Sequence, residues 1–214
     1  MPIAHKYKCI FIHVPKCAGK SVEDKLRIKS ALNVPSFYFL YGFHGNIQLQ
    51  HLTPEQMLRL NYVKQDVFNS YFKFCFVRNP YDRAVSDYFW HRKFFEKGPE
   101  QMMVDSFRSY LYLAHSQLTR FPNKDNIWCH FFPQHWYVRD EKGHTIPDFV
   151  GRFENLKADF AFVAARIGLN DTDLPHIGKT EHEPYADYYN EECRMMVEDL
   201  YGEDIRYFEY EFGE

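Results

Sequence analysis

Two short apolar segments, each followed at once by a loop and a helix start, constrain the fold of this chain more than any other feature. Lys8–Val14 and Tyr71–Val77 are rich in β-branched and aromatic residues, which is typical of buried strands. This alternation of strand, loop and helix favours an α/β fold with a mainly parallel central sheet flanked by helices. Ligands in such folds usually bind outside the carboxyl ends of the strands.

Two predicted helix starts have recognisable capping residues. Thr53 is a predicted N-cap, with Pro54 at the first helical position and Gln56 placed to complete a capping box. Asn79-Pro80-Tyr81-Asp82 has the same arrangement, so we expect a long helix from Asn79 toward Phe95.

The rest of the chain predicts a further set of short elements. We expect helices at Ser21–Lys29, Gln101–Arg120, Leu156–Ile167 and Tyr189–Leu200, and strands at Ser36–Tyr41, Trp136–Val138, Phe149–Phe153 and Ile205–Phe208. No repeat, low-complexity tract or Gly/Ser-rich linker divides the 214 residues. We therefore expect a single domain over residues 1–214.

Charge and cysteine content exclude several classes of protein. The formal net charge of -3 argues against broad nucleic-acid binding, which needs many uncompensated Lys and Arg. The five scattered cysteines include no Cys-x-x-Cys pair and fit free thiols in a reducing compartment. The N-terminal residues predict neither a signal peptide nor a membrane span, so we expect a soluble, cytoplasmic protein.

The loop after the first predicted strand is suited to hold an anion. A loop that joins a strand to a helix offers unpaired backbone N–H groups and the positive end of the helix. Within the loop, Lys16 supplies a cation, Gly19 permits close backbone approach and Ser21 supplies a hydroxyl donor. An ordinary connection with lysines facing solvent remains the alternative.

A nucleotide-triphosphate loop is a competing interpretation, because Gly19-Lys20-Ser21 matches the end of the G-x-x-x-x-G-K-[ST] motif. However, Val14 occupies the position of the first glycine of that motif. The second predicted strand also ends in Arg78, and not in an aspartate that would orient magnesium. Both departures disfavour ATP or GTP hydrolysis.

Arg78 and Ser86 form the second candidate phosphate grip. Arg78 follows the end of a predicted strand, and Ser86 lies in the helix that comes next. A guanidinium offers a forked, permanently charged grip on phosphate oxygens. A structural ion pair between Arg78 and Asp82 is the alternative.

Taken together, these residues resemble the sulfotransferases that use the donor 3′-phosphoadenosine 5′-phosphosulfate (PAPS). Residues 12–21 (IHVPKCAGKS) resemble their 5′-phosphosulfate loop, and residues 76–86 (FVRNPYDRAVS) resemble their 3′-phosphate segment. Residues 148–156, 174–180 and 204–212 extend the resemblance. The branch most similar to this chain is the carbohydrate sulfotransferase-like group, with the heparan-sulfate 2-O-sulfotransferases and small bacterial relatives.

The resemblance implies a P-loop-like sulfotransferase fold and metal-free, in-line transfer from PAPS to an acceptor hydroxyl, leaving PAP. It implies donor contacts from residues of the two grips and a late loop, namely Pro15, Lys16, Cys17, Ala18, Gly19, Lys20, Ser21, Arg78, Ser86 and Lys179. Lys16 is placed to stabilise the charge that grows on the departing phosphate. The position of Lys20 is commonly Thr in the family, which makes Lys20 the least secure of these contacts.

The acceptor hydroxyl must lose its proton as the sulfuryl group is transferred to it, and histidine is a natural base near neutral pH. His51 lies before the capped helix, and His51-Leu52-Thr53 resembles the His-x-Ser/Thr arrangement around the base in the 2-O-sulfotransferase branch. His44, flanked by Gly42 and Gly45, is the rival candidate. His13 lies within the strand pattern and is expected to be a packed, hydrogen-bonded ring.

We expect no metal site, because the pairs His176/His182 and Cys129/His130 have no further ligands close in sequence.

The resemblance predicts an O-sulfotransferase that acts on a hydroxyl, with a carbohydrate or glycan as the acceptor. A catalytically silent PAP- or PAPS-binding protein and a P-loop phosphotransferase or NTPase are the alternatives.

Overall fold

The fold was determined as a computed structural model, which describes residues 3–28, 42–94, 104–175, 177 and 182–213. The predicted strand Ser36–Tyr41 and the late-loop residues Lys179 and Thr180 lie outside these ranges.

A four-stranded, mostly parallel sheet forms the centre of the protein. Its strands are β1 (Ile3–Ala4), β2 (Cys9–Ile12), β5 (Phe72–Val77) and β6 (Phe149–Arg152), in the order β1-β2-β5-β6. β1 is antiparallel to β2, whereas β2, β5 and β6 are parallel, with Ile12 opposite Cys75 and Val77 opposite Arg152. The predicted α/β class with a mainly parallel sheet is confirmed.

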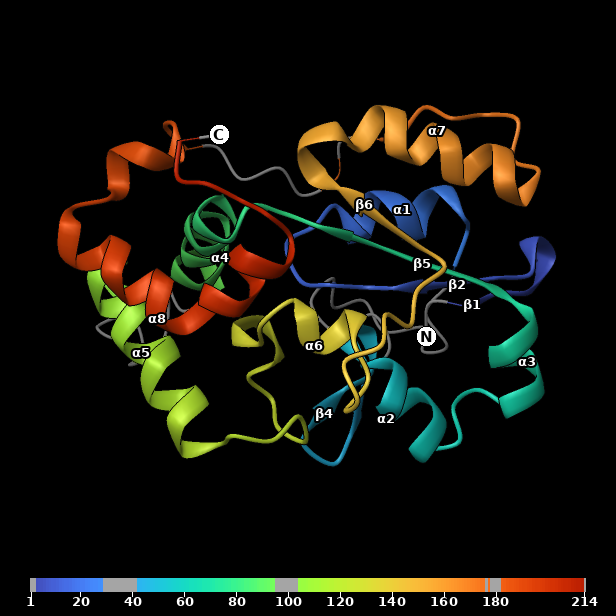
Figure 1. Cartoon of the computed structure of the whole chain (residues 1–214), viewed down its shortest axis with the longest axis horizontal. Coiled ribbons are helices and arrows are strands. Elements are labelled where there is room, and N and C mark those ends of the chain that lie inside the picture. Colours follow the sequence, from blue (N-terminus) through green and yellow to red (C-terminus); the bar gives the residue numbers. More distant parts are fainter. Residues whose placement is uncertain (1–2, 29–41, 95–103, 176, 178–181, 214) are drawn as a thin grey trace.

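Helices cover both faces of this sheet and form a layer beyond its end (Figure 1). α1 (Gly19–Lys25) and α7 (Leu156–Ile167) lie on one side, and α2 (Pro54–Arg59) and α6 (His135–Val138) lie on the other. α4 (Pro80–Phe94), α5 (Phe107–Arg120) and α8 (Glu191–Tyr207) pack together beyond the carboxyl end of β5. The remaining elements are α3 (Gln65–Ser70), the hairpin β3 (Phe43–His44) and β4 (Ile47–Gln48), and 3₁₀ turns at His5–Tyr7, Leu49–His51, Cys129–Phe131, Phe153–Asn155 and Tyr185–Tyr188.

Both predicted helix starts are present. The Thr53 hydroxyl accepts a hydrogen bond from the Gln56 backbone, and the Gln56 side chain accepts one from the Thr53 backbone, which completes the capping box. The Asn79 side chain accepts from the backbone N–H of Tyr81 at 3.1 Å and caps α4. Local sequence therefore controls where these helices begin.

Two predicted strands are wrong, and three helices have ends that differ from the prediction. Trp136–Val138 belongs to α6, and Ile205–Phe208 forms the C-terminal end of α8 and its cap. α1 spans Gly19–Lys25 instead of Ser21–Lys29, and α5 starts at Phe107 instead of Gln101. α8 spans Glu191–Tyr207 instead of Tyr189–Leu200. α6 is helical despite β-prone side chains because the distant Asp204 carboxylate accepts hydrogen bonds from the backbone N–H groups of Gln134 and His135, at 2.6 and 2.8 Å.

Two hydrophobic clusters form the core, and the partly buried Leu118 packs against both. The first surrounds the sheet and includes Phe11 and Phe74, whose ring centroids lie 5.2 Å apart. The second joins α4, α5 and α8 through residues such as Tyr88, Tyr110 and Val197. α4 begins after the carboxyl end of β5 and packs into the second cluster from its first turns onward, through Tyr81, Ala84 and Val85.

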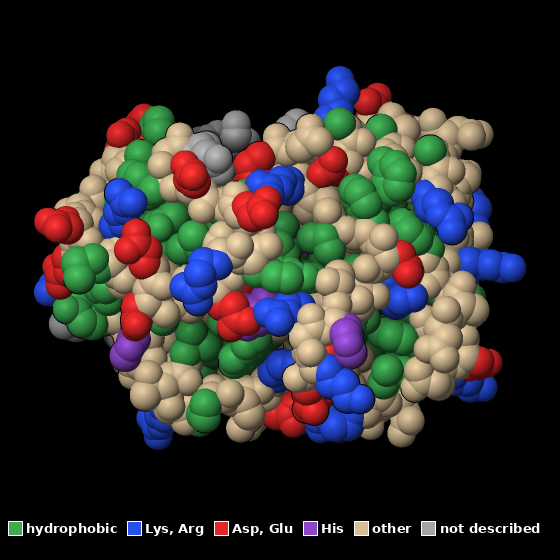
Figure 2. Space-filling view, in the orientation of Figure 1, with side chains coloured by type: hydrophobic (Ala, Val, Ile, Leu, Met, Phe, Trp, Pro, Cys, Tyr) green, Lys and Arg blue, Asp and Glu red, His purple; other side chains and the backbone are tan. Residues whose placement is uncertain are grey.

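The surface charges and the helices can be compared with the expectation that the protein binds neither nucleic acid nor membrane. Lys and Arg side chains alternate with Asp and Glu over the face shown in Figure 2, so this face has no large area of one charge sign. No described helix is both long and apolar enough to cross a membrane.

The capping box at Thr53 provides a test of whether local side chains control the start of α2. Thr53→Ala should lower the free energy of unfolding by about 1 kcal/mol, because it leaves a backbone donor of α2 without its partner. Urea unfolding measures the change. Thr172→Ala, at an exposed position outside the helices and strands, is the matched control and should have no effect. Equal stability of the two variants would contradict this role of Thr53.

Candidate active site

The loop between β2 and α1 has a strained backbone. Lys16 and Ala18 have positive φ angles of 67° and 61°, in the left-handed region that residues other than glycine rarely adopt. Each such residue costs on the order of 1 to 3 kcal/mol, and such strain concentrates at ligand sites. Alternating backbone handedness can also turn successive N–H groups toward one point, which is a recurring way to bind an anion.

Gly19 is required by its close contact with His13. A Cβ atom at position 19 would lie 1.7 Å from Nε2 of His13, well inside van der Waals contact. His13 is held in place because its Nδ1 lies 2.7 Å from Glu23, which also accepts a hydrogen bond from Gln50 at 3.1 Å. His13 is thus the packed, hydrogen-bonded ring that the sequence predicts.

Arg78 extends from the end of β5 toward the first loop. Its guanidinium pairs with Asp82 at 2.7 Å, so the structural ion pair considered as an alternative is present. The same guanidinium also donates a hydrogen bond to the carbonyl oxygen of Lys16 at 3.3 Å and lies over the ring of Phe153. The structure therefore brings the two predicted phosphate grips together.

Gln134 joins the two loops and was missed by the sequence analysis. Its side-chain oxygen accepts from the backbone of Arg78 at 2.9 Å and from the Cys17 thiol at 3.4 Å, and its amide donates to the carbonyl of Arg78 at 2.8 Å. Burial raises the pKa of Cys17 to about 12, so the thiol remains protonated and acts as a donor. No motif marks Gln134, because its partners lie far away in sequence.

The other predicted donor contacts occupy different environments. Burial lowers the pKa of Lys16 to about 8, with Asp87 opposing the shift. Burial also lowers the pKa of Lys20, which is partly exposed, with Glu23 opposing the shift. Ser21 is buried and accepts a hydrogen bond from the backbone of Ile177 at 3.3 Å.

Ser86 is buried on α4, one helical turn beyond Asp82, the partner of Arg78. Residues four apart share a helix face. The Ser86 hydroxyl therefore belongs to the face of α4 that begins at the Arg78 ion pair.

The two histidines considered as bases lie in different surroundings. His51 is buried, and its Nδ1 lies 3.0 Å from the carbonyl oxygen of His13. A carbonyl only accepts, so Nδ1 carries the proton and Nε2 keeps its lone pair. Burial and the neighbouring His13 and His130 rings hold the pKa of His51 well below its ordinary value. His44 is exposed on β3 and contacts the Tyr62 hydroxyl at 3.2 Å.

A buried cluster of Asp87, His91 and His130 was also missed. The sequence analysis found no further ligand near His130, but the fold places the ligand-type atoms of these three residues within 4.8 Å of one another. Nδ1 of His130 lies 2.6 Å from the Asp87 carboxylate, and Nδ1 of His91 lies 3.2 Å from it. Tetrahedral zinc bonds of roughly 2.0 to 2.1 Å keep ligand atoms more than about 3 Å apart, so the 2.6 Å contact fits a hydrogen bond.

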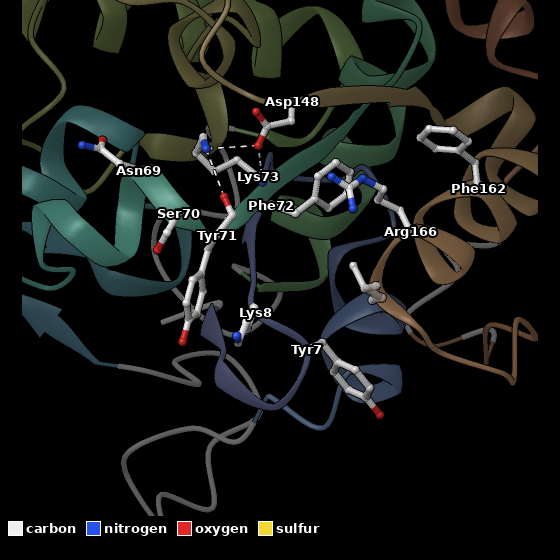
Figure 3. A pocket seen from close by; sticks show the side chains of 11 residues that line it. Tyr7, Lys8, Asn69, Ser70, Tyr71, Phe72, Lys73, Asp148, Phe162 and Arg166 are labelled. Carbon is white, nitrogen blue, oxygen red and sulfur yellow. Dashed lines mark hydrogen bonds and ion pairs between the residues drawn. The ribbon is translucent and has the colours of Figure 1, made fainter.

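A cavity of about 620 Å³ opens at the opposite edge of the sheet, near the amino ends of the strands (Figure 3). It lies between Tyr7, Tyr71, Phe162 and Arg166. The ammonium group of Lys73 in its wall is paired with Asp148 at 3.0 Å. None of the predicted site residues that the structure describes lines this cavity, so the carboxyl edge of the sheet is the candidate active site.

Comparisons with known proteins give a family for the chain. The model of the family described as "Sulfotransferase family" matches residues 1–211. An uncharacterized protein of Archaeoglobus fulgidus is 34% identical over 120 residues, which cover 54% of this chain and 82% of that protein. No solved structure matches.

The contact between Gly19 and His13 provides a test. Gly19→Ala should lower the free energy of unfolding by about 2 kcal/mol, because its methyl group must displace the His13 ring. Gly202→Ala is the matched control, since its Cβ would meet only the flexible end of Arg206 at 3.2 Å. Urea unfolding of both variants checks the prediction, and comparable stabilities would refute the tight packing at Gly19.

Proposed function

Since the chain belongs to the sulfotransferase family, which transfers sulfuryl groups, we propose that PAPS is its donor and that its acceptor is a hydroxyl of a carbohydrate or glycan. The observation that carries the proposal is the meeting of the two loops, where Arg78 donates to the carbonyl of Lys16 at 3.3 Å. A nucleotide with separate 5′ and 3′ anionic groups needs two such grips on one edge of the sheet.

In this proposal the loop from Pro15 to Ser21 holds the 5′-phosphosulfate, and Arg78 and Ser86 hold the 3′-phosphate. Two left-handed residues in the loop supply the backbone shape for the first grip. The Asp82 carboxylate fixes the Arg78 guanidinium for the second. Lys179 and Thr180 are proposed to close over the donor, on the strength of the family resemblance alone.

The proposed transfer is a single in-line displacement. The acceptor oxygen forms a bond to sulfur while its proton passes to Nε2 of His51, and the bond from sulfur to the phosphate oxygen breaks. The electron pair of that bond leaves on PAP, where Lys16 stabilises the developing charge. His51 is preferred to His44 because its Nδ1 is fixed against the loop that carries Lys16, whereas His44 lies on an exposed hairpin.

The proposed carbohydrate acceptor rests on the resemblance of the sequence to the carbohydrate branch of the family. All five cysteines are free and buried, which is typical of proteins in a reducing compartment such as the cytoplasm.

Radiolabelled sulfate transfer from PAPS to cell-derived glycans, lipids and small hydroxyl compounds would identify the acceptor class.

Thermal melting tests the donor. PAP at about 100 times its dissociation constant should add ~2.7 kcal/mol of stability without magnesium, because the proposed site uses side-chain cations and backbone amides. Arg78→Ala and Ser86→Ala should reduce this stabilisation. ATP and GTP, each with and without magnesium, are the comparison ligands, and a preference for magnesium-ATP would favour an NTPase instead.

The pH dependence of turnover tests the two catalytic assignments. His51 must be unprotonated to act as a base, and its lowered pKa should let turnover persist below pH 6.5 or so. Lys16, with a pKa of about 8, should lose its proton above that pH, so kcat/KM for PAPS should fall there.

Substitutions test which residue sets the acid side and which sets the alkaline side of the pH profile. Lys16→Ala and His51→Ala should each abolish turnover, and Lys16→Arg should remove the alkaline fall from any remaining activity, because a guanidinium stays charged. PAP binding by a protein that transfers sulfate to no acceptor would favour the silent binding protein. A dead His44→Ala beside an active His51→Ala would move the base role to His44.

A further inference from the structure

The buried carboxylate of Asp87 lies beside the candidate active site, and neither the sequence motifs nor the family match assigns it a role. We propose that this carboxylate, fixed by His130 and Tyr110, is the counter-charge shared by Lys16 and His51. Asp87 and His130 are then positioning residues for the reaction. This inference rests on the proposed function and adds to it the group that balances charge in a site removed from water.

The surroundings of Asp87 are built to hold a charge. Only 1% of the residue is exposed, so an ionised carboxylate there must be hydrogen-bonded to persist. One oxygen accepts from Nδ1 of His130 at 2.6 Å, and the other accepts from the Tyr110 hydroxyl at 2.9 Å. Nδ1 of His91 lies 3.2 Å from the same carboxylate and 3.0 Å from the backbone carbonyl of Asp87.

Asp87 also fixes the tautomer of His130. An ionised carboxylate only accepts hydrogen bonds, so the proton of His130 lies on Nδ1 and Nε2 keeps its lone pair. The ring is held between Trp90, stacked at 4.2 Å, and His51, whose ring centroid lies 5.1 Å away. Arg83 donates to the His130 carbonyl at 3.3 Å. The negative charge therefore lies one histidine ring away from the proposed base.

The electrostatics of the cluster agree with this geometry. Burial alone would raise the pKa of Asp87, but the neighbouring His91 and His130 hold it well below its ordinary value. Burial lowers the pKa of His130 to about 4, against the opposing effect of Asp87, so the ring is neutral at pH 7. Asp87 is thus the ionised partner and His130 the neutral one.

The same carboxylate also acts on the pKa of Lys16. Burial lowers its pKa, and Asp87 is the acid that opposes this shift. The charged and titratable groups that act on Lys16 or lie beside Asp87 come from several elements: Cys17, Lys20, Arg78, Asp87, His91, Tyr110 and His130. Around His51 the corresponding groups are His13, Asp87 and His130.

The counter-charge has a defined part in the transfer. When Nε2 of His51 takes the acceptor proton, a positive charge forms in a buried place, and burial disfavours it. The carboxylate of Asp87 balances this charge through the His130 ring. The proton stays on His51 until product leaves, and no proton passes to Asp87.

The experiment measures the pKa of the Lys16 amine directly, without an acceptor. Trace acetylation by acetic anhydride between pH 6 and 10, followed by mass spectrometry that separates Lys16 from Lys20, gives the midpoint for amine reactivity. That midpoint should lie near 8 in the unaltered protein. In Asp87→Asn it should fall by about one pH unit, because loss of a buried negative charge favours the neutral amine.

Two variants separate charge from packing. Asp148→Asn removes a carboxylate at the opposite edge of the sheet, where it pairs with Lys73 at 3.0 Å, and should leave the Lys16 midpoint unchanged. Tyr110→Phe removes one hydrogen bond to Asp87 but keeps its charge, so it should also leave the midpoint in place. An unchanged midpoint in a folded Asp87→Asn protein overturns the proposal.

Two further measurements need no Asp87 variant. They test the proposal if Asp87→Asn does not fold, and they separate it from the proposed function. In the unaltered protein, ¹⁵N spectra of the histidine rings between pH 6 and 8 should show His130 neutral and protonated at Nδ1, and the opposite tautomer would overturn the proposal. PAP should slow acetylation of Lys16. Absence of that protection counts against the proposed donor and leaves the Asp87 comparison intact, so the two failures are distinguishable.

Discussion

The parallel pairing of β2 with β5 is the constraint on which the rest of the site depends. Because Ile12 lies opposite Cys75, the two strands reach the same edge of the sheet together, and the loops that follow them start side by side. Arg78 can then reach the carbonyl of Lys16, and Gln134 can bond to residues of both loops. A sheet of another order would separate groups that are 62 residues apart in the chain.

α4 follows this strand edge and presents two of its faces to the candidate site. Asp82, which pairs with Arg78, and Ser86 lie one turn apart on the first face. Arg83 and Asp87 lie one turn apart on the adjacent face, where they hold the backbone and the ring of His130. One helix therefore serves the proposed donor grip and the proposed acid–base site at once.

The site combines charge with burial, which is costly unless each charge has a partner. The structure meets this requirement with short, specific pairs between Arg78 and Asp82 and between Asp87 and His130. It also keeps His51 neutral, since burial lowers the pKa of the ring. A buried, neutral ring at the position of the proposed base becomes charged only when the proposed reaction brings it a proton.

The sequence by itself determined the features that depend on neighbouring residues. The strands that end before Pro15 and Arg78, the capping box at Thr53 and the Asn79 cap all follow from local side chains, and so does the α/β class that their alternation predicts. The tertiary structure alone decided features that need distant partners. Asp204 makes α6 a helix where the side chains favour a strand, and the fold brings Asp87 to His130, 43 residues away. Hydrogen bonds and buried charges are set by distance in space, and no pattern along the chain encodes that distance.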